Sequence, residues 1–106
     1  MREIIVHGSS MWPTFRDGER LLMAPLEGTP LEGALRVGQV VVAEHPFKRG
    51  VLMVKRIARV EADGRLFLEG DNPDPLASED SHNFGSVMPG AVLGVVEDAL
   101  PGDARG

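Results

Sequence analysis

Two short stretches of the chain carry the side chains best suited to catalysis. The first, Gly8 to Thr14, reads Gly-Ser-Ser-Met-Trp-Pro-Thr and places two hydroxyls beside a small residue. The second, Val54 to Arg56, has Lys55 at its centre. A serine is a poor nucleophile until a base takes its proton. The chain has no cysteine, and its three histidines show no triad-like setting, so the residues point to Ser10 as nucleophile and Lys55 as its base.

Lys55 must lose its charge before it can act as a base. A free lysine has a pKa of about 10.4 and is a cation at neutral pH. Because side chains alternate along a strand, a strand over Val51–Val60 places Lys55 on one face between Met53 and Ile57. Such apolar surroundings disfavour the charged form, and Ser–Lys pairs are a known nucleophile arrangement. The alternative is a surface lysine whose stem covers apolar area, and the spacing to Ser10 is unlike a helical Ser-x-x-Lys motif.

Composition indicates one ordinary soluble domain over residues 1–106, with 99–106 as a loose tail. Hydrophobic residues make up 42% and charged residues 25% of the 106 residues. The net charge of −5 argues against a nucleic-acid partner, which would need clustered lysine and arginine. No apolar run approaches the roughly 20 residues that span a bilayer, and the first six residues are too short and charged for a signal peptide. We expect a cytoplasmic protein without a membrane anchor, and the sequence does not predict its oligomeric state.

The chain is expected to be mostly β, with long connecting loops. Glycine and proline are frequent, and Asp63-Gly64 lies between two strand-like runs, as in a hairpin turn. Gly8 is expected to bend the chain just before the serines, while Pro25–Gly38 and the polar Gly70–Gly85 are expected loops. The predicted strands are Glu3–Val6, Arg20–Ala24, Gln39–Glu44, Val51–Val60, Leu66–Glu69 and Val92–Val96.

Other candidate sites are weaker. The histidines His7, His45 and His82 lack a metal-ligand spacing, and the acids of the polar loop lack the glycine and regular oxygens of a calcium loop. We therefore predict no metal and no cofactor. We expect Met11 and Trp12 to wall a substrate cleft beside the nucleophile, the alternative for the tryptophan being ordinary core packing.

Four stretches stand out in chain order: Ser10–Thr14, Gly38–Val42, Met53–Arg56, and Gly70–Asn72 with Ser78–Ser81. Together they resemble the signature boxes of type I signal peptidases, which are Ser–Lys proteases with a mostly β core, and the match covers about residues 4 to 97. Through His45-Pro46-Phe47 as well, the chain most resembles the soluble branch known as nickel-type superoxide dismutase maturation proteases.

The resemblance implies a serine endopeptidase that removes an N-terminal extension from a precursor polypeptide through an acyl-enzyme. It implies that Ser10 is the nucleophile, Lys55 the general base and Ser78 the residue that positions the lysine. The oxyanion would lie on the backbone N–H of Ser10, with Ser9 as a possible second donor. The residues implied to brace the site are Arg56, Asp71, Asn72 and Asp80.

The chain departs from the family pattern at two positions. Some members have a serine two positions before the nucleophile that donates to the oxyanion, and here that residue is Gly8. The family usually has an arginine two residues after the loop aspartate, and here it is His82, which predicts a weaker ion pair with Asp80.

Two other functions remain open from the sequence. One is a catalytically silent module of the same fold that binds an extended peptide as an added strand. The other is a self-cleaving repressor-type domain, which would need a scissile bond upstream of the serine. Only nine residues precede Ser10, and the chain has no Ala-Gly dipeptide of the kind such domains cut.

Overall fold

The structure is a computed structural model, and it describes residues 1–26 and 35–99. Its strands follow the runs of branched side chains closely, and the helical elements are single short turns. The strands are β1 (Arg2–Ile5), β2 (Arg20–Pro25), β3 (Val40–Glu44), β4 (Leu52–Val60), β5 (Leu66–Glu69) and β6 (Val92–Ala99). The helical turns are η1 (Pro75–Ala77), α1 (Ser81–Phe84) and η2 (Pro89–Ala91).

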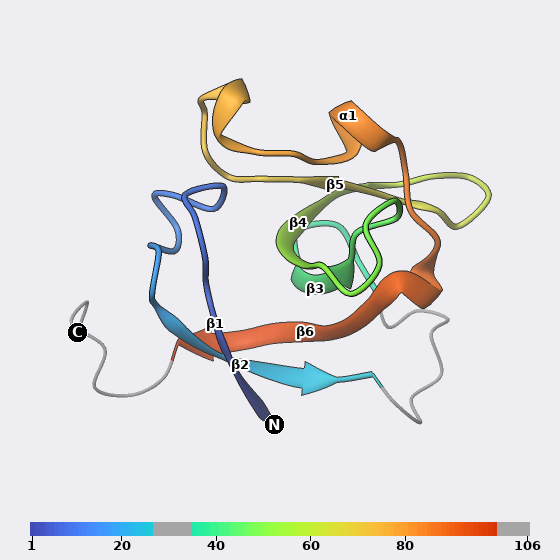
Figure 1. The fold of residues 1–106 in the computed structure, drawn as a ribbon. Helices are drawn as coiled ribbons and strands as arrows, with labels where there is room; N and C mark the ends of the chain where they lie inside the picture. Colours follow the sequence, from blue (N-terminus) through green and yellow to red (C-terminus); the bar gives the residue numbers. More distant parts are fainter. Residues whose placement is uncertain (27–34, 100–106) are drawn as a thin grey trace.

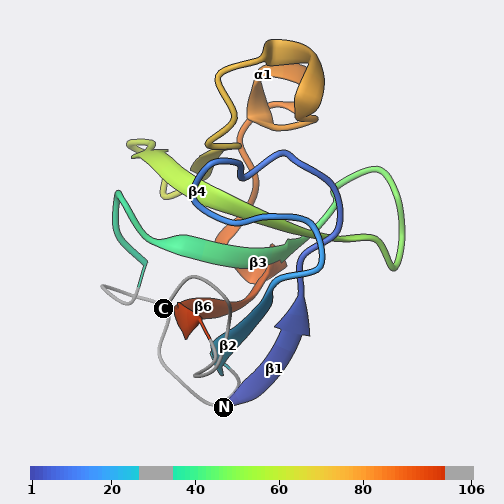
Figure 2. The same ribbon diagram turned by 90° about the vertical axis from the view of Figure 1, so that its left-hand side faces the viewer.

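All described strands belong to one antiparallel sheet with the order β1-β2-β6-β3-β4-β5. The sheet curls, so that β4 and β5 rise over β3 while β2 and β6 cross beneath them (Figure 1). The α1 turn lies at the β5 end of the sheet, on the side away from the N-terminus (Figures 1 and 2). This confirms the expected mostly β fold.

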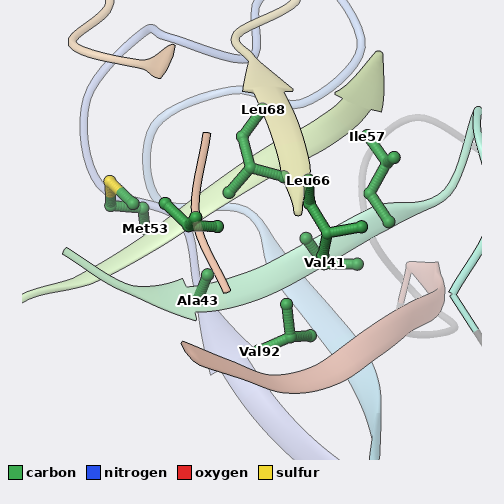
Figure 3. Close-up of a cluster of buried hydrophobic side chains, with 8 residues drawn as sticks. Val41, Ala43, Met53, Ile57, Leu66, Leu68 and Val92 are labelled. Atoms are coloured by element: carbon green, nitrogen blue, oxygen red, sulfur yellow. The ribbon is translucent and has the colours of Figure 1, made fainter. Parts of the chain in front are cut away.

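The largest core cluster fills the inside of the curl. Side chains from β3, β4, β5 and β6 point toward one another there (Figure 3). Its buried members are Val41, Ala43, Met53, Ile57, Leu66, Leu68, Val87 and Val92. A second cluster uses the neighbouring residue Val40, which alternation along β3 turns to the opposite face. Because both faces of β3 are covered, four of its five residues are buried.

The strand boundaries differ from the expected ones mainly at the C-terminal end. The last strand was expected to end at Val96, but β6 continues to Ala99 because it pairs with β2 as far as Leu21. Ala99 is therefore part of the sheet, and the rest of the expected tail lies outside the described residues. Most of the Pro25–Gly38 loop, residues 27–34, also lies outside them.

The expected hairpin between β4 and β5 is present, and Gly64 has the positive φ of +89° that this turn requires. The polar segment 70–85 is not a featureless loop, since it contains η1 and α1. Within the described residues, no helix is long and apolar enough to cross a membrane.

The inside of the curl should dominate stability. Ile57 is fully buried in it, whereas Val60 on the same strand is 42% exposed. We expect Ile57→Ala to lower the free energy of unfolding by about 2–5 kcal/mol, because it leaves a cavity. Val60→Ala should cost less than about 1 kcal/mol. Urea denaturation of both variants checks this, and equal losses would contradict the described packing.

Candidate active site

Ser10 lies on a turn that directly follows β1. Gly8 takes a φ of +83°, which bends the chain, and its N–H donates to the Asp17 carboxylate at 2.7 Å. The Val6 N–H donates to the Glu19 carbonyl and the Gly18 N–H donates to the Val6 carbonyl, and these bonds close the base of the loop. The expected bend at Gly8 is confirmed, and it presents Ser10 at the mouth of a cleft.

The segment that follows β5 holds this turn in place from the other side. Asn72 donates its backbone N–H to the Ser10 carbonyl at 2.9 Å and its side-chain N–H to the Ser9 carbonyl at 2.8 Å. Gly70 allows the approach, because a Cβ there would lie 2.6 Å from the Ser10 carbonyl oxygen and 2.4 Å from Ser78 Oγ. The carbonyls of the serine turn are thus fixed by Asn72, which is distant in sequence, and these contacts leave the serine hydroxyls unconstrained.

Asp71 joins this segment to β4. Arg56 donates to both carboxylate oxygens of Asp71, at 2.8 and 2.6 Å, and the Thr14 hydroxyl donates to one of them at 2.6 Å. The Arg56 hydrogen bonds, assisted by Thr14, hold the pKa of Asp71 below its usual value despite partial burial. The same hydrogen bonds raise the pKa of Arg56. Arg56 and Asp71, expected to brace the site, are therefore in contact.

Lys55 is buried, with 4% of its surface exposed. It pairs with Val41 of β3, and the alternation along β4 places it between buried Met53 and Ile57, as expected. Burial lowers the pKa of Lys55 below 10.5, although the negative charges of Asp80 and Glu79 oppose the shift. The surface-lysine alternative is thereby excluded.

Ser78 links the lysine to a buried carboxylate. Lys55 Nζ donates to Ser78 Oγ at 3.0 Å, and Ser78 Oγ donates to Asp80 Oδ2 at 3.2 Å. Since a carboxylate only accepts, the hydroxyl proton of Ser78 points to Asp80 and its oxygen accepts from the amine. The lone pair of a neutral Lys55 amine is therefore not used by Ser78.

Asp80 is buried, with 7% exposed, and it begins α1 as its N-cap. Burial acts to raise its pKa, but backbone N–H donors from Gly70 and His82 and the His82 ring outweigh this and hold the pKa of Asp80 below its usual value. The sequence predicted that His82 would weaken the contact with Asp80. Nevertheless His82 Nδ1 lies 2.9 Å from Asp80 Oδ1, since the start of α1 brings the ring beside the cap.

A cleft of about 460 Å³ lies beside these groups, and both Ser10 and Lys55 line it. Among the hydrogen bonds of residues 1–26 and 35–99, none joins Ser10 Oγ to Lys55 Nζ. Catalytic hydrogen bonds are commonly loose before substrate binds. The walls are apolar side chains of β1, β3 and β4, and the polar lining consists of His7, Ser10, His45, Lys48, Lys55 and Glu79.

Two expected cleft residues, Met11 and Trp12, lie elsewhere than predicted, and the expected role of Ser9 stays a prediction. Met11 is fully buried in the second core cluster with Val6 and Phe15, because the serine turn packs it inward, so it does not wall the cleft. Trp12 is 50% exposed and does not line the cleft. Ser9 is exposed, and its carbonyl oxygen accepts hydrogen bonds from the Trp12 N–H and the Asn72 side chain.

Sequence reasoning missed three contributors. Thr14 was noticed only as part of the serine stretch, yet its hydroxyl reaches Asp71. His45 and Glu79 were not assigned a role, but they meet at the edge of the cleft, with Nε2 and Oε1 2.5 Å apart. The His45 and Lys48 hydrogen bonds hold the pKa of Glu79 below its usual value. The one sequence signal that could have indicated a role for His45 is its position as a polar residue immediately after a buried strand.

The histidines and acidic residues that were considered as metal ligands do not come together as a metal site in the described residues. In the part of the chain that the structure describes, no three His, Cys, Asp or Glu side chains are placed to hold a metal ion together.

Compared with models of known protein families and with curated proteins, the chain matches none. The case for function therefore depends on the site's geometry and on the resemblance of its motifs.

The buried amine makes a testable contribution to stability. Because folding lowers the pKa of Lys55, the unfolded chain binds more protons than the folded chain between that lowered pKa and 10.5. Wild-type stability must therefore rise with pH across this range, whereas Lys55→Met lacks the rise. Urea unfolding from pH 7 to 10.5 should show the stability advantage of Lys55→Met shrinking as pH increases. A difference independent of pH would contradict the burial of a titrating amine.

The close approach at Gly70 gives a second prediction. Gly70→Ala should lower the free energy of unfolding by about 1–3 kcal/mol, because the new methyl collides with the Ser10 carbonyl and the Ser78 side chain. Gly90→Ala is the matched control, since a Cβ there meets nothing within 4 Å, and it should change stability by about 0.5 kcal/mol or less. Thermal unfolding of both variants is the measurement, and equal effects would contradict the approach.

Proposed function

We propose that this protein is a serine endopeptidase that uses Ser10 as nucleophile and Lys55 as general base. The observation that carries the proposal is the buried Lys55 amine, which lines the same cleft as Ser10 and has a lowered pKa. Its contact with Ser78 leaves the amine lone pair available. A neutral amine beside a serine hydroxyl is a working general base.

The reaction would proceed by acyl transfer. Lys55 Nζ takes the proton of Ser10 as Ser10 Oγ attacks a peptide carbonyl, and the resulting ammonium then protonates the departing amine. An ester on Ser10 remains, and the amine, neutral again, activates water to release it. Ser78 and Asp80 support the lysine while it carries charge, since the Asp80 carboxylate stabilises the ammonium through the intervening hydroxyl.

The oxyanion of the tetrahedral intermediate would lie on the backbone N–H of Ser10. This arrangement follows from the resemblance and agrees with the fixed serine turn, in which Asn72 immobilises the carbonyls of Ser9 and Ser10. A donor that needs no reorganisation stabilises developing charge efficiently. Ser9 keeps its role as the proposed second donor because its hydroxyl is on the same turn.

The proposed substrate is an extended segment of a precursor polypeptide, cut between small residues. The size of the cleft, about 460 Å³, and its apolar walls suit side chains of an extended peptide. The narrower proposal, removal of an N-terminal extension such as that of nickel superoxide dismutase, comes from the resemblance of the motifs alone.

A library of synthetic peptides with randomised sequence tests the activity without a guess at the substrate. Mass spectrometry of the products should show cleavage by the wild type and loss of at least about a thousandfold in Ser10→Ala and in Lys55→Met. Thr14→Ser keeps the hydroxyl hydrogen bond to Asp71 and is the control for non-specific effects of substitution and purification. It should retain most activity. Cleavage that persists in Ser10→Ala would contradict the proposal.

The pH dependence of cleavage is a separate prediction. Since only the neutral amine accepts a proton, the rate should rise with pH through the lowered pKa of Lys55 and then level off. The rate is measured from pH 5 to 10 on any peptide that the library identifies. A rate that falls as the pH rises from 5 to 10 would exclude Lys55 as the general base. Peptide binding without cleavage by the wild type would instead favour the silent binding module.

A further inference from the structure

His45 is a buried polar side chain that the proposed reaction does not use. It follows β3 directly, and its side chain is only 5% exposed. Its ring packs against Phe47 of the turn after β3 and against Phe84 of α1, with centroids 6.2 and 5.0 Å away. A buried imidazole in contact with both the β3–β4 turn and α1 is placed to couple them.

The hydrogen bonds of His45 determine its tautomer. The backbone N–H of Phe47 donates to His45 Nδ1 at 3.0 Å, and a backbone N–H can only donate. Nδ1 therefore carries no proton, and the ring proton is on Nε2. Nε2 lies 2.5 Å from Glu79 Oε1, so the neutral ring donates a hydrogen bond to Glu79 rather than forming an ion pair with it.

Glu79 stands between the two residues that support Lys55. Ser78 accepts from the lysine amine, and Asp80 accepts from Ser78. Glu79 Oε1 also accepts a hydrogen bond from Nζ of the exposed Lys48 side chain at 3.1 Å. The segment Ser78–Asp80 is thus attached at its midpoint to His45 and to Lys48 of the β3–β4 turn.

We propose that His45 is a positioning residue, which holds Glu79 through Nε2–H and so fixes the segment Ser78–Asp80 against Lys55. Its consequence for catalysis rests on the proposed function, but its structural part does not. Without the hydrogen bond between His45 and Glu79, the segment Ser78–Asp80 becomes more mobile. The Ser78 hydroxyl then no longer holds the Lys55 amine in a fixed position. Small displacements of a catalytic group lower a rate strongly.

Two substitutions at His45 both remove the imidazole ring, but they differ in whether the hydrogen bond to Glu79 can still form. His45→Gln retains an N–H at the position of Nε2 and can still donate to Glu79. His45→Asn retains an acceptor for the Phe47 N–H but is too short to reach Glu79. The pair differs in the hydrogen bond that the proposal requires, with His45→Gln as the conservative rescue.

The first readout is amide hydrogen exchange in the full chain, which needs no activity. The N–H groups of Gly70 and His82 donate to Asp80 and report on the segment. They should exchange about three- to tenfold faster in His45→Asn and within about twofold of wild type in His45→Gln. Amides of β2 should not change in either. Equal exchange in both variants and the wild type would overturn the proposal.

A second variant guards against a misfolded His45→Asn. Glu79 is about half exposed, so Glu79→Ala removes the same bond from the other side without leaving a buried cavity. It should speed exchange at Gly70 and His82 in the same way. Lys48→Gln removes only the exposed contact and should leave exchange within about twofold of wild type. Unchanged exchange in Glu79→Ala would also overturn the proposal.

The catalytic readout is the acylation of Ser10 by the p-nitrophenyl ester of N-acetyl-alanine, located by peptide mapping. The maximal rate should fall about tenfold or more in His45→Asn with little change in KM, and recover in His45→Gln. Altered exchange without any acylation, in the wild type included, would leave the positioning role intact and contradict the protease proposal. Acylation that is equal in His45→Asn and wild type would overturn the positioning role.

Discussion

The candidate site depends on the burial of one amine, that of Lys55. Taking the Lys55 side chain out of water disfavours its charged form, and nothing on its own face of β4 compensates, since Met53 and Ile57 are apolar. The compensation comes from Ser78 and, behind it, from Asp80. The carboxylate is close enough to moderate the loss of charge, but a hydroxyl separates it from the amine. The arrangement keeps the lysine titratable instead of fixing it as an ion.

The rest of the site follows from the need to bring three distant segments to this amine. The serine turn approaches from β1, the segment 70–72 closes on it from β5, and Ser78–Asp80 covers the other side. Gly70 is the point at which all three meet, because its missing side chain is the space that the Ser10 carbonyl and Ser78 occupy. Arg56 and Asp71 tie the second segment to β4, so that the strand carrying the lysine also carries one of its supports.

Much of this could be predicted from local sequence. The period of two along β4 predicted the buried face of Lys55, and the runs of branched residues predicted strands whose ends differ from the observed ones by at most three residues. The contact of Lys55 with Ser78 was expected through the motif resemblance, which implied only a bracing role for Arg56 and Asp71 and not their contact with each other. The hydrogen bonds of the Ser9 carbonyl do not bear on its expected hydroxyl donation, which stays a prediction.

The remainder depended on tertiary contacts that no local pattern encodes. Met11 was expected in the cleft, but the direction of a side chain in a turn follows from what the turn packs against, here Val6 and Phe15. The bond between His45 and Glu79 joins residues 34 apart in sequence, each in an irregular segment without a period. His82 retains its contact with Asp80 because a one-turn helix begins there, which the polar composition of the segment did not reveal.

The central claim is that Lys55 is a buried amine ready to accept a proton, and its titration tests this most directly. The chain has only two lysines, so the side-chain NMR signals of 13C- and 15N-labelled lysine are few, and the one lost in Lys55→Met belongs to Lys55. We expect this signal to titrate below the ordinary lysine pKa of 10.5, because burial disfavours the charged amine. A midpoint at or above that value would mean that the amine stays charged at neutral pH, and the proposed general base would have to be abandoned.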